Sequence, residues 1–221
     1  MERAPGVIGL LFGLSLALII LLLGPLLLFN PAFTSALQVR HGVAAELGTT
    51  QDEVERVTGS YLADIYLDGD FDASLDGSGP LLDESERSHM TEVSRLVRLL
   101  AGIVVVALIV AGITAAWLRH EPRRQGRIML LAAGAIGVAA VTLAVVFAVA
   151  FEPAFLAFHE LFFPPGTYLF ATGSELIVLF PEPFWFDAAL LSGAAIVLVA
   201  VLVSLIGLWR WRSARTTARL A

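Results

Sequence analysis

The order of apolar and polar positions divides this chain into four long apolar runs separated by polar segments. The runs cover residues 7–29, 99–118, 128–151 and 188–209, and none of them contains a charged residue. A helix needs about 20 apolar residues to cross the hydrocarbon core of a bilayer, where its backbone groups must bond within the segment. The pattern therefore predicts an all-α membrane protein with four transmembrane helices.

The first apolar run is interpreted as a retained helix. It has 23 residues, whereas the apolar core of a secretory signal peptide has about 7–15. Arg3 is the only basic residue before it, and the small residues Thr34, Ser35 and Ala36 make a weak cleavage site. We expect all four runs to stay in the mature protein as one integral membrane domain.

The distribution of arginine predicts the orientation of these helices. All 14 basic residues are arginine, and nine of them lie before the first run, in residues 119–127 or in residues 210–221. Residues 30–98 and 152–187 contain 18 of the 20 acidic residues and five arginines. Since positively charged loops stay in the cytoplasm, both termini are expected there, and the two acidic segments are expected to form an extracytoplasmic cap.

The net charge of −6 gives no indication of nucleic-acid binding, because the acidic residues gather in the two outer segments. The basic tail at residues 210–221 is expected to contact anionic lipid head groups. The chain has no cysteine, which excludes disulfides, thiolate metal sites and a cysteine acyl-enzyme. No nucleotide motif and no serine nucleophile motif is present.

The first outer segment is predicted to contain two helices. Thr50 and Glu53 have the spacing of a capping box, and apolar residues follow at helical spacing, namely Val54, Val57, Tyr61, Leu62 and Ile65. The second helix is expected to begin with Asp83 or Ser85 as its cap and to continue into the second apolar run. The acidic stretch between them departs from a calcium loop at its sixth and twelfth positions, so we expect a solvated turn.

Two histidines are the strongest candidates for chemistry. His89 lies about two turns before the second apolar run, and His159 follows the third run closely, so both are expected near the membrane surface. A catalytic pair and two unrelated structural histidines are both compatible with this spacing. His41 and His120 lie at a loop start and in a cytoplasmic turn, and they are weaker candidates.

The second outer segment is unusually aromatic. Residues 155–186 hold 10 of the 21 aromatic residues of the chain, which exceeds an ordinary interfacial belt. Such a segment is typical of a loop that handles an apolar molecule beside the bilayer. Glu182 stands between Pro181 and Pro183 within this cluster, where it is either a structural acid or an acid of the site. A zinc site built from His89, Glu92, His159 and Glu160 is a minor alternative, because no HExxH motif is present.

Two blocks of this sequence resemble the lipoprotein intramolecular transacylases, a family of four-helix bacterial membrane proteins. The first block is SERSHMTEV at residues 85–93, and the second extends from Phe158 to Phe184 with matching aromatic, glycine and Pro-Glu positions. Glu92 stands where the family usually has Asp, and Tyr168 stands where it usually has Trp. The hydropathy layout is similar along nearly the whole chain.

The resemblance implies an acyltransferase of the bacterial cell membrane that needs no cofactor or metal. Its substrate is a lipoprotein whose N-terminal cysteine carries a diacylglyceryl group, and the sn-2 acyl chain moves to the α-amino group of that cysteine. The positions that match the catalytic histidines are His89 and His159. Glu92 or Glu182 would orient a histidine. Membrane lipid is the second expected partner of the protein. The rings expected to bind the substrate are those of Phe158, Phe162, Phe163, Tyr168, Phe180, Phe184 and Trp185.

A second reading belongs to another functional class. A non-catalytic membrane protein could bind a lipid or a lipoprotein through the same aromatic cap. A metal-dependent membrane hydrolase is the third reading. The histidine pair distinguishes the first two, since a binding protein should keep most of its function without it.

Overall fold

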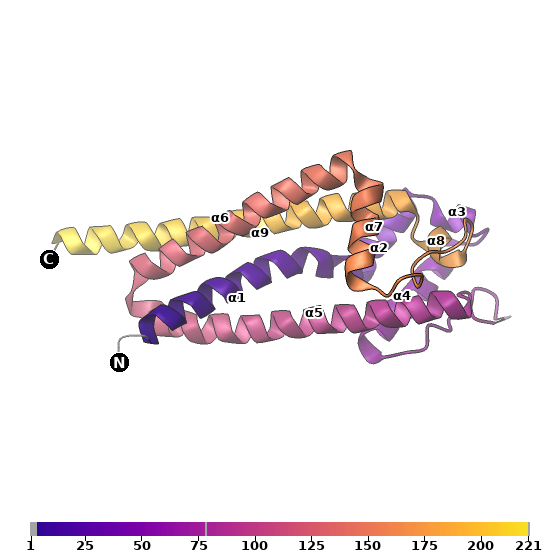
Figure 1. Ribbon diagram of the computed structural model, residues 1–221, viewed down its shortest axis with the longest axis horizontal. Coiled ribbons are helices and arrows are strands. Elements are labelled where there is room, and N and C mark those ends of the chain that lie inside the picture. Colours follow the sequence, from indigo (N-terminus) through magenta and orange to yellow (C-terminus); the bar gives the residue numbers. More distant parts are fainter. Residues whose placement is uncertain (1–3, 78, 221) are drawn as a thin grey trace. The chain divides into compact units, whose positions relative to one another are not determined.

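The computed structural model describes residues 4–77 and 79–220, and all regular structure among them is helical (Figure 1). The elements are α1 (Ala4–Leu26), η1 (Leu27–Phe29), α2 (Pro31–Arg40), α3 (Val43–Glu46), α4 (Gln51–Leu67), α5 (Glu84–Trp117), η2 (Leu118–His120), α6 (Pro122–Val149), α7 (Phe151–Phe162), α8 (Glu175–Leu179) and α9 (Glu182–Leu220). The predicted all-α class is confirmed.

Four of these helical segments are long and apolar enough to cross a membrane, as predicted. They are Gly6–Phe29, Glu84–His120, Pro122–Val149 and Glu182–Ser213. Helix α5 has 34 residues, or roughly 51 Å at 1.5 Å per residue, which exceeds the roughly 30 Å of the hydrocarbon core. The apolar run 99–118, which α5 shares with η2, suffices to span, so residues 84–98, which carry the charges of α5, extend beyond the membrane-spanning segment. The orientation of the four helices stays a prediction.

The contacts divide the chain into two compact units. Among the described residues, the first unit comprises 4–25, 101–144 and 192–220, and the second comprises 26–100 and 145–191. In the first unit, Gly126 of α6 lies so close to α9 that a Cβ atom would meet the backbone of Gly207. Small residues of this kind let membrane helices approach closely. Ile20 of α1 is fully buried against alanines of α6 and α9.

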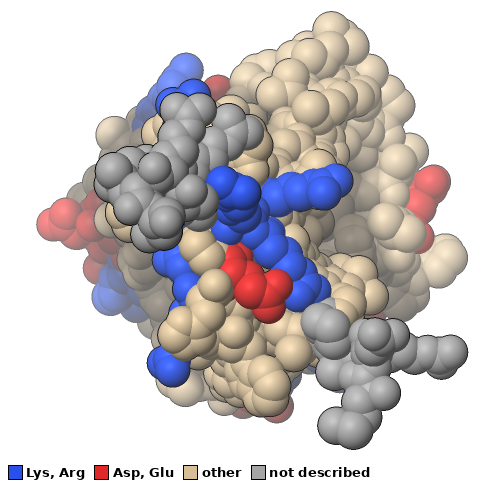
Figure 2. All heavy atoms as spheres, turned by 90° about the vertical axis from the view of Figure 1, so that its left-hand side faces the viewer, with Lys and Arg blue, Asp and Glu red and all other residues tan. Residues whose placement is uncertain are grey.

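Arginines gather on one face of the first unit. Figure 2 shows blue side chains around a red one on the face seen from the left-hand side of Figure 1. Arg124, in the first turn of α6, makes an ion pair of 3.0 Å with Glu121, which precedes that helix. This grouping agrees with the arginine pattern on which the predicted orientation rests.

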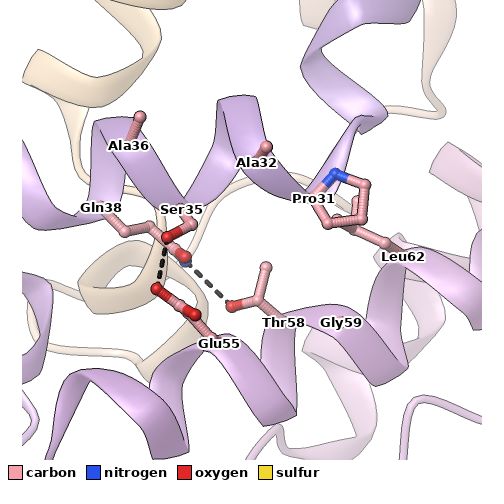
Figure 3. Close-up of a pocket in the computed structure, with 9 residues that line it drawn as sticks. All are labelled: Pro31, Ala32, Ser35, Ala36, Gln38, Glu55, Thr58, Gly59 and Leu62. Atoms are coloured by element: carbon pink, nitrogen blue, oxygen red, sulfur yellow. Dashed lines mark hydrogen bonds between the residues drawn. The ribbon is translucent and has the colours of Figure 1, made fainter.

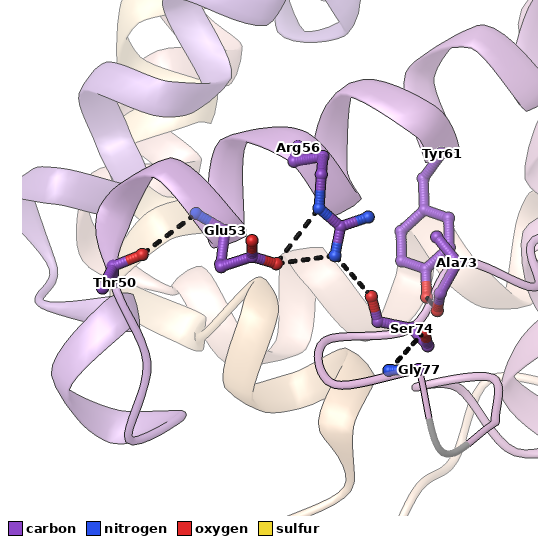
Figure 4. Close-up of polar contacts among 7 residues, drawn as sticks. All are labelled: Thr50, Glu53, Arg56, Tyr61, Ala73, Ser74 and Gly77. Carbon is purple, nitrogen blue, oxygen red and sulfur yellow. Dashed lines mark hydrogen bonds and ion pairs between the residues drawn. The ribbon is translucent and has the colours of Figure 1, made fainter.

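Helix α4 organises the core of the second unit. Thr50 Oγ1 accepts a hydrogen bond from the backbone N–H of Glu53 at 3.3 Å, which confirms the predicted N-cap (Figure 4). The Glu53 carboxylate pairs with Arg56 at 2.6 Å and does not reach back to residue 50, so only half of the capping box forms. The predicted apolar face is buried, namely Val54, Val57, Tyr61, Leu62 and Ile65.

The acidic stretch after α4 is held by protein contacts. The Tyr61 hydroxyl donates to the carbonyl oxygen of Ala73 at 3.1 Å, and Arg56 donates to that of Ser74 at 2.6 Å (Figure 4). Asp68 at the end of α4 pairs with Arg98 of α5 at 2.6 Å. These contacts fix the connection between α4 and α5.

A buried carboxylate joins the two blocks of sequence that carry the family resemblance. Asp83 Oδ1 accepts from the N–H of Glu86 at 2.9 Å, and Glu86 Oε2 accepts from the N–H of Asp83 at 2.8 Å. Asp83 is therefore the cap of α5 in a reciprocal capping box. Glu86 Oε1 also accepts from the N–H of Leu176 in α8 at 2.9 Å. With 2% of its surface exposed, Glu86 fixes α8 beside the start of α5.

Candidate active site

His89 and His159 face each other inside the second unit. His89 lies on α5 one turn after Glu86 and is 6% exposed, and His159 lies on α7 and is half-buried. The centres of the two imidazole rings are 6.0 Å apart, with 26° between the ring planes. The structure thus brings together the two residues that sequence analysis singled out.

A backbone carbonyl defines the hydrogen-bonding state of His159. Its Nδ1 lies 2.8 Å from the carbonyl oxygen of Phe155, one turn earlier in α7. A carbonyl oxygen only accepts, so the proton of the neutral ring is assigned to Nδ1 and Nε2 keeps a lone pair. Burial lowers the pKa of His159, and the bond to Phe155 opposes that shift only in part.

His89 lies beside a carboxylate. Its Nδ1 is 3.7 Å from Glu92 Oε2, an ion-pair distance longer than a hydrogen bond, and no hydrogen-bond partner among the described residues reaches this buried atom. Burial, followed by the nearby His159, lowers the pKa of His89 to about 4, against the influence of Glu92. Residue 89 lies ten positions before the membrane-spanning stretch. Because the pKa of each ring lies below the ordinary value of about 6.5, both rings are neutral at pH 7.

A hydroxyl group that sequence analysis missed completes this polar cluster. The Thr167 hydroxyl donates to Glu92 Oε2 at 2.7 Å, the same oxygen that faces His89. The neighbouring Pro165-Gly166 pair indicates a turn in the sequence, but nothing in the sequence pairs that turn with a helix 75 residues earlier. Of the two proposed orienting acids, Glu92 is therefore the one found beside a histidine.

Aromatic rings surround the two imidazoles. The His89 ring lies 4.8 Å from Phe163 and 5.6 Å from Phe170, centre to centre. The His159 ring contacts four others, at 4.3 Å for Phe155, 5.3 Å for Tyr168 and 5.5 Å for both Phe158 and Phe163. Phe155 and Phe170 were absent from the predicted binding residues, although both lie in the aromatic segment. The histidine pair thus has apolar walls on several sides.

The remaining predicted rings lie farther from the pair. Phe162 contacts Phe158 at 4.9 Å and is 45% exposed. Phe180, Phe184 and Trp185 contact one another, and Trp185 reaches Phe155 at 5.9 Å. Phe184 is 1% exposed and packs into a small core with Leu37 and Ala188. Through Phe162 and Trp185 these rings contact Phe158 and Phe155, which lie against His159.

Glu182 is exposed at the first position of α9. No hydrogen bond or ion pair joins it to either histidine in the described part of the chain. An acidic residue is favourable at a helix N-terminus, which accounts for Glu182 without a role in the site. Its proposed role as an orienting acid has no contact to support it and stays a prediction.

The family model of the lipoprotein intramolecular transacylase Lit matches residues 9–185 of this chain. The chain belongs to the Lit family. The matched region contains both histidines, Glu92, Thr167 and all of the aromatic rings named above, and it covers most of the 221 residues. No curated protein sequence matches the chain significantly.

Solved structures of Lit from Bacillus cereus resemble the chain along its whole length. One has a TM-score of 0.78 at 17% sequence identity, and the match covers 100% of both chains. A variant of that protein with a histidine replaced by arginine gives 0.78 at 17% identity, covering 97% of this chain and 95% of that chain. A variant with the same histidine replaced by alanine gives 0.74 at 18%, covering 99% and 97%. At this identity the likeness shows a shared fold.

The other two histidines of this Lit-family chain lie in separate polar pairs, part-buried for His41 and exposed for His120. His41 Nε2 lies 2.9 Å from Asp187 Oδ2, which also pairs with Arg40 at 3.0 Å. His120 accepts a hydrogen bond from the adjacent Arg119 at 2.8 Å and is exposed. Glu160, the fourth residue of the zinc alternative, is exposed, and the described residues contain no group of three or more side chains suited to hold a metal ion.

A cavity of about 470 Å³ lies between α2 and α4, away from the predicted site residues (Figure 3). It is lined by Pro31, Ala32, Ser35, Ala36, Gln38, Glu55, Thr58, Gly59 and Leu62. Two hydrogen bonds join its walls, from Ser35 to Glu55 at 2.6 Å and from Gln38 to Thr58 at 3.0 Å. The cavity contains no acid–base pair comparable with the histidines, so the histidine pair is the candidate site of this Lit-family chain.

Proposed function

We propose that this protein is a lipoprotein intramolecular transacylase. It moves the sn-2 acyl chain of the diacylglyceryl group to the α-amino group of the N-terminal cysteine and leaves a lyso-form lipoprotein. The observation that supports this most directly is the pair formed by His89 and His159, 6.0 Å apart within aromatic walls, in a chain of the Lit family.

The reaction requires orientation more than an energy source. An amide is more stable than an ester, so the transfer is downhill and no nucleotide is consumed. The amine and the ester belong to the same molecule, and the site has to hold them against each other. Correct orientation contributes up to about 7–11 kcal/mol to the lowering of a barrier, and rings that exclude water favour aminolysis over hydrolysis.

Two neutral imidazoles match the proton balance of this reaction. A free α-amino group has a pKa of about 7.7–8.0, so the substrate arrives largely as an ammonium. It must lose one proton before its nitrogen attacks the ester carbonyl and a second one as the C–N bond forms. Two proton acceptors are therefore needed, and His89 and His159 each have a nitrogen free for this purpose.

The carboxylate of Glu92 favours His89 as the base for the second proton. An imidazolium at position 89 would lie 3.7 Å from Glu92 Oε2, and hydrogen bonds of catalytic groups often tighten only once substrate is bound. His159 has a carbonyl oxygen as its partner, and no carboxylate pairs with it in the described part of the chain. We assign to His159 the proton shed by the ammonium, which it then donates from Nε2 to the leaving glycerol oxygen.

The step balances in bonds and protons. The C–N bond forms, the bond between the acyl carbon and the glycerol oxygen breaks, and the glycerol oxygen takes the proton from His159. His89 releases its proton to water at the end. The products are an amide, a free sn-2 hydroxyl group and one proton, and no water molecule is consumed.

The site is proposed to face the outside of the bacterial cell membrane, with both termini in the cytoplasm. The arginines of residues 119–127 and 210–221 support this orientation. The alternative of a non-catalytic lipid- or lipoprotein-binding protein is supported by the same aromatic cluster. It gives no reason for a buried His89 ring that faces the half-buried His159 ring at 6.0 Å.

The experiment that tests the function uses the purified protein in lipid vesicles with a synthetic diacylglyceryl lipopeptide. The mass of the lipopeptide does not change on intramolecular transfer, so tandem mass spectrometry must locate the acyl chain. We expect the N-terminal fragment to gain the acyl chain as the glyceryl fragment loses it. Binding without any change in either fragment would support the non-catalytic alternative.

The rate should persist at acidic pH. Burial lowers the pKa of His89 to about 4 and also lowers that of His159. The neutral, basic form of His89 is thus retained as pH falls through about 6.5, its ordinary pKa, and is lost only near pH 4. Single-turnover rates with bound lipopeptide, measured from pH 4 to 8, should have no acid limb centred at 6.5. A midpoint near 6.5, the ordinary value of a free imidazole, would contradict the buried environment of His89.

The aromatic wall should control the fate of the acyl chain. Tyr168→Ala or Phe162→Ala is expected to slow transfer several-fold and to raise the share of acyl chain released as fatty acid, because water then reaches the ester. Tyr168→Trp should be mild, since an indole preserves the wall and a polar tip. A labelled acyl chain followed into amide and free acid measures this partition. If the transfer rate and the partition of the acyl chain between amide and free acid are unchanged in every variant, the aromatic cluster is an ordinary interfacial belt.

A further inference from the structure

We propose that Thr167 is a positioning residue of the site, which holds Glu92 in the orientation that serves His89. The inference rests on the proposed function and adds a group that the sequence blocks of the family resemblance do not single out. Three observations carry it: a hydroxyl-to-carboxylate contact of 2.7 Å, a shared carboxylate oxygen, and a buried His89 nitrogen that has no hydrogen-bond partner.

Local sequence explains why Thr167 reaches this place. Residues 164–167 are Pro-Pro-Gly-Thr, and the N–H of Thr167 donates to the carbonyl oxygen of Pro164 at 3.3 Å. Pro165 and Gly166 occupy the two central positions of this turn, and Gly166 has a φ of 87°. Proline followed by glycine with positive φ fits a type II turn. The chain therefore reverses direction just after Phe163, and the Thr167 side chain reaches Glu92 of α5.

The hydroxyl of Thr167 has one proton and two acceptors within reach. Glu92 Oε2 lies at 2.7 Å and the carbonyl oxygen of Pro164 lies at 3.0 Å. A carboxylate is the stronger acceptor and the shorter contact, so the proton is assigned to Glu92. The same Oε2 atom is the one that faces His89 Nδ1 at 3.7 Å.

The contact restricts a flexible side chain. A glutamate has several rotatable bonds and loses considerable rotamer freedom when it is fixed. With Oε2 held by Thr167, the carboxylate stays on the Nδ1 side of His89. This favours the neutral ring form with its proton on Nδ1 and its lone pair on Nε2, the arrangement that the base needs. In metalloproteins, residues that orient a metal ligand by a hydrogen bond are worth about 10–100-fold in metal affinity or activity. We expect an effect of similar size for a residue that orients Glu92.

Thr167→Val removes the hydroxyl and preserves the shape of the side chain. We expect it to lower kcat by about tenfold or more, with KM for the lipopeptide changed less than threefold. Thr167→Ser retains the donor and should recover most of the rate. Thr172→Val is the matched control, because Thr172 is exposed in the same loop and has no hydrogen bond in the described chain. The inference fails if Thr167→Val and Thr172→Val have the same kcat.

A double-mutant cycle distinguishes positioning from simple loop attachment. If Thr167 acts through Glu92, the variant that combines Thr167→Val with Glu92→Gln should be no slower than Glu92→Gln alone. If the rate loss of the double variant equals the product of the two single losses, Thr167 acts independently of Glu92 and the proposal is overturned.

A spectroscopic readout separates this inference from the proposed function. ¹⁵N NMR of labelled histidine should show the His89 ring mainly with its proton on Nδ1 in the unaltered protein, and a mixture of both tautomers in Thr167→Val. This result is expected even if no transacylation is detected, in which case the proposed function fails while the positioning role stands. Identical His89 spectra in the two proteins would overturn the positioning role, whatever the activity.

Discussion

Replacing His89 or His159 by alanine is expected to lower the rate of transacylation by at least about a hundredfold. Positioned acid–base groups contribute about 10²–10⁴-fold, and each imidazole handles one of the two amine protons in the proposed mechanism. The rate is measured by tandem mass spectrometry of the lipopeptide with purified variants in vesicles. Because the two rings act on the same transfer, the double variant should be little slower than the slower single one.

The matched control for this pair is His120→Ala. His120 is exposed and accepts a hydrogen bond from its neighbour Arg119, so its removal should leave the rate within twofold of the unaltered protein. Circular dichroism and size-exclusion profiles establish that the variants insert and fold. A loss below about tenfold for both His89→Ala and His159→Ala would contradict the catalytic assignment.

The second large effect concerns stability. Glu86→Ala is expected to destabilise the second unit by about 3–5 kcal/mol, since each hydrogen bond to a charged group contributes about 1.5–3 kcal/mol. The substitution leaves the N–H groups of Asp83 and Leu176 without their buried acceptor. It also releases α8 from the start of α5, one turn before His89. Denaturant unfolding in detergent, followed by tryptophan fluorescence, measures the free energy of unfolding.

Glu84→Ala provides the comparison for Glu86→Ala. Glu84 lies in the same first turn of α5 but is exposed, so its loss should change the free energy of unfolding by less than about 1 kcal/mol, as is usual for surface positions. Equal unfolding midpoints for Glu84→Ala and Glu86→Ala would show that the buried carboxylate does not join these segments in solution.

The elements that depend on local sequence were predictable. The four apolar runs, the Thr50 cap and the buried face of α4 follow from periodicity and capping, which act within a few residues. The similar distance of His89 and His159 from an apolar run predicts a similar depth for both. The contact of their rings at 6.0 Å depends on how α7 packs against α5, which the spacing does not give.

The contacts that complete the site were not predictable in this way. Glu86 with Leu176 and Thr167 with Glu92 join segments 90 and 75 residues apart, and such pairing depends on how separate helices pack. The same limit explains why Phe170 was not predicted, since its ring contacts His89 of another element. Phe155 lies one turn before His159 in α7, so helical spacing could have identified it. Glu182 was considered because of its aromatic and proline neighbours in sequence, yet its side chain is exposed.

The central claim is that the acyl chain moves within one substrate molecule. It is tested by a crossover experiment with two lipopeptides, one with a deuterated sn-2 acyl chain and the other with a peptide of heavy isotopes. The two are mixed in vesicles with the purified protein, and the N-terminal fragments are sequenced by tandem mass spectrometry. The proposed mechanism predicts that each N-acylated peptide carries only its own acyl chain, with a free sn-2 hydroxyl group on the same molecule. Heavy peptides bearing deuterated acyl chains, or free fatty acid as the main product, would contradict it.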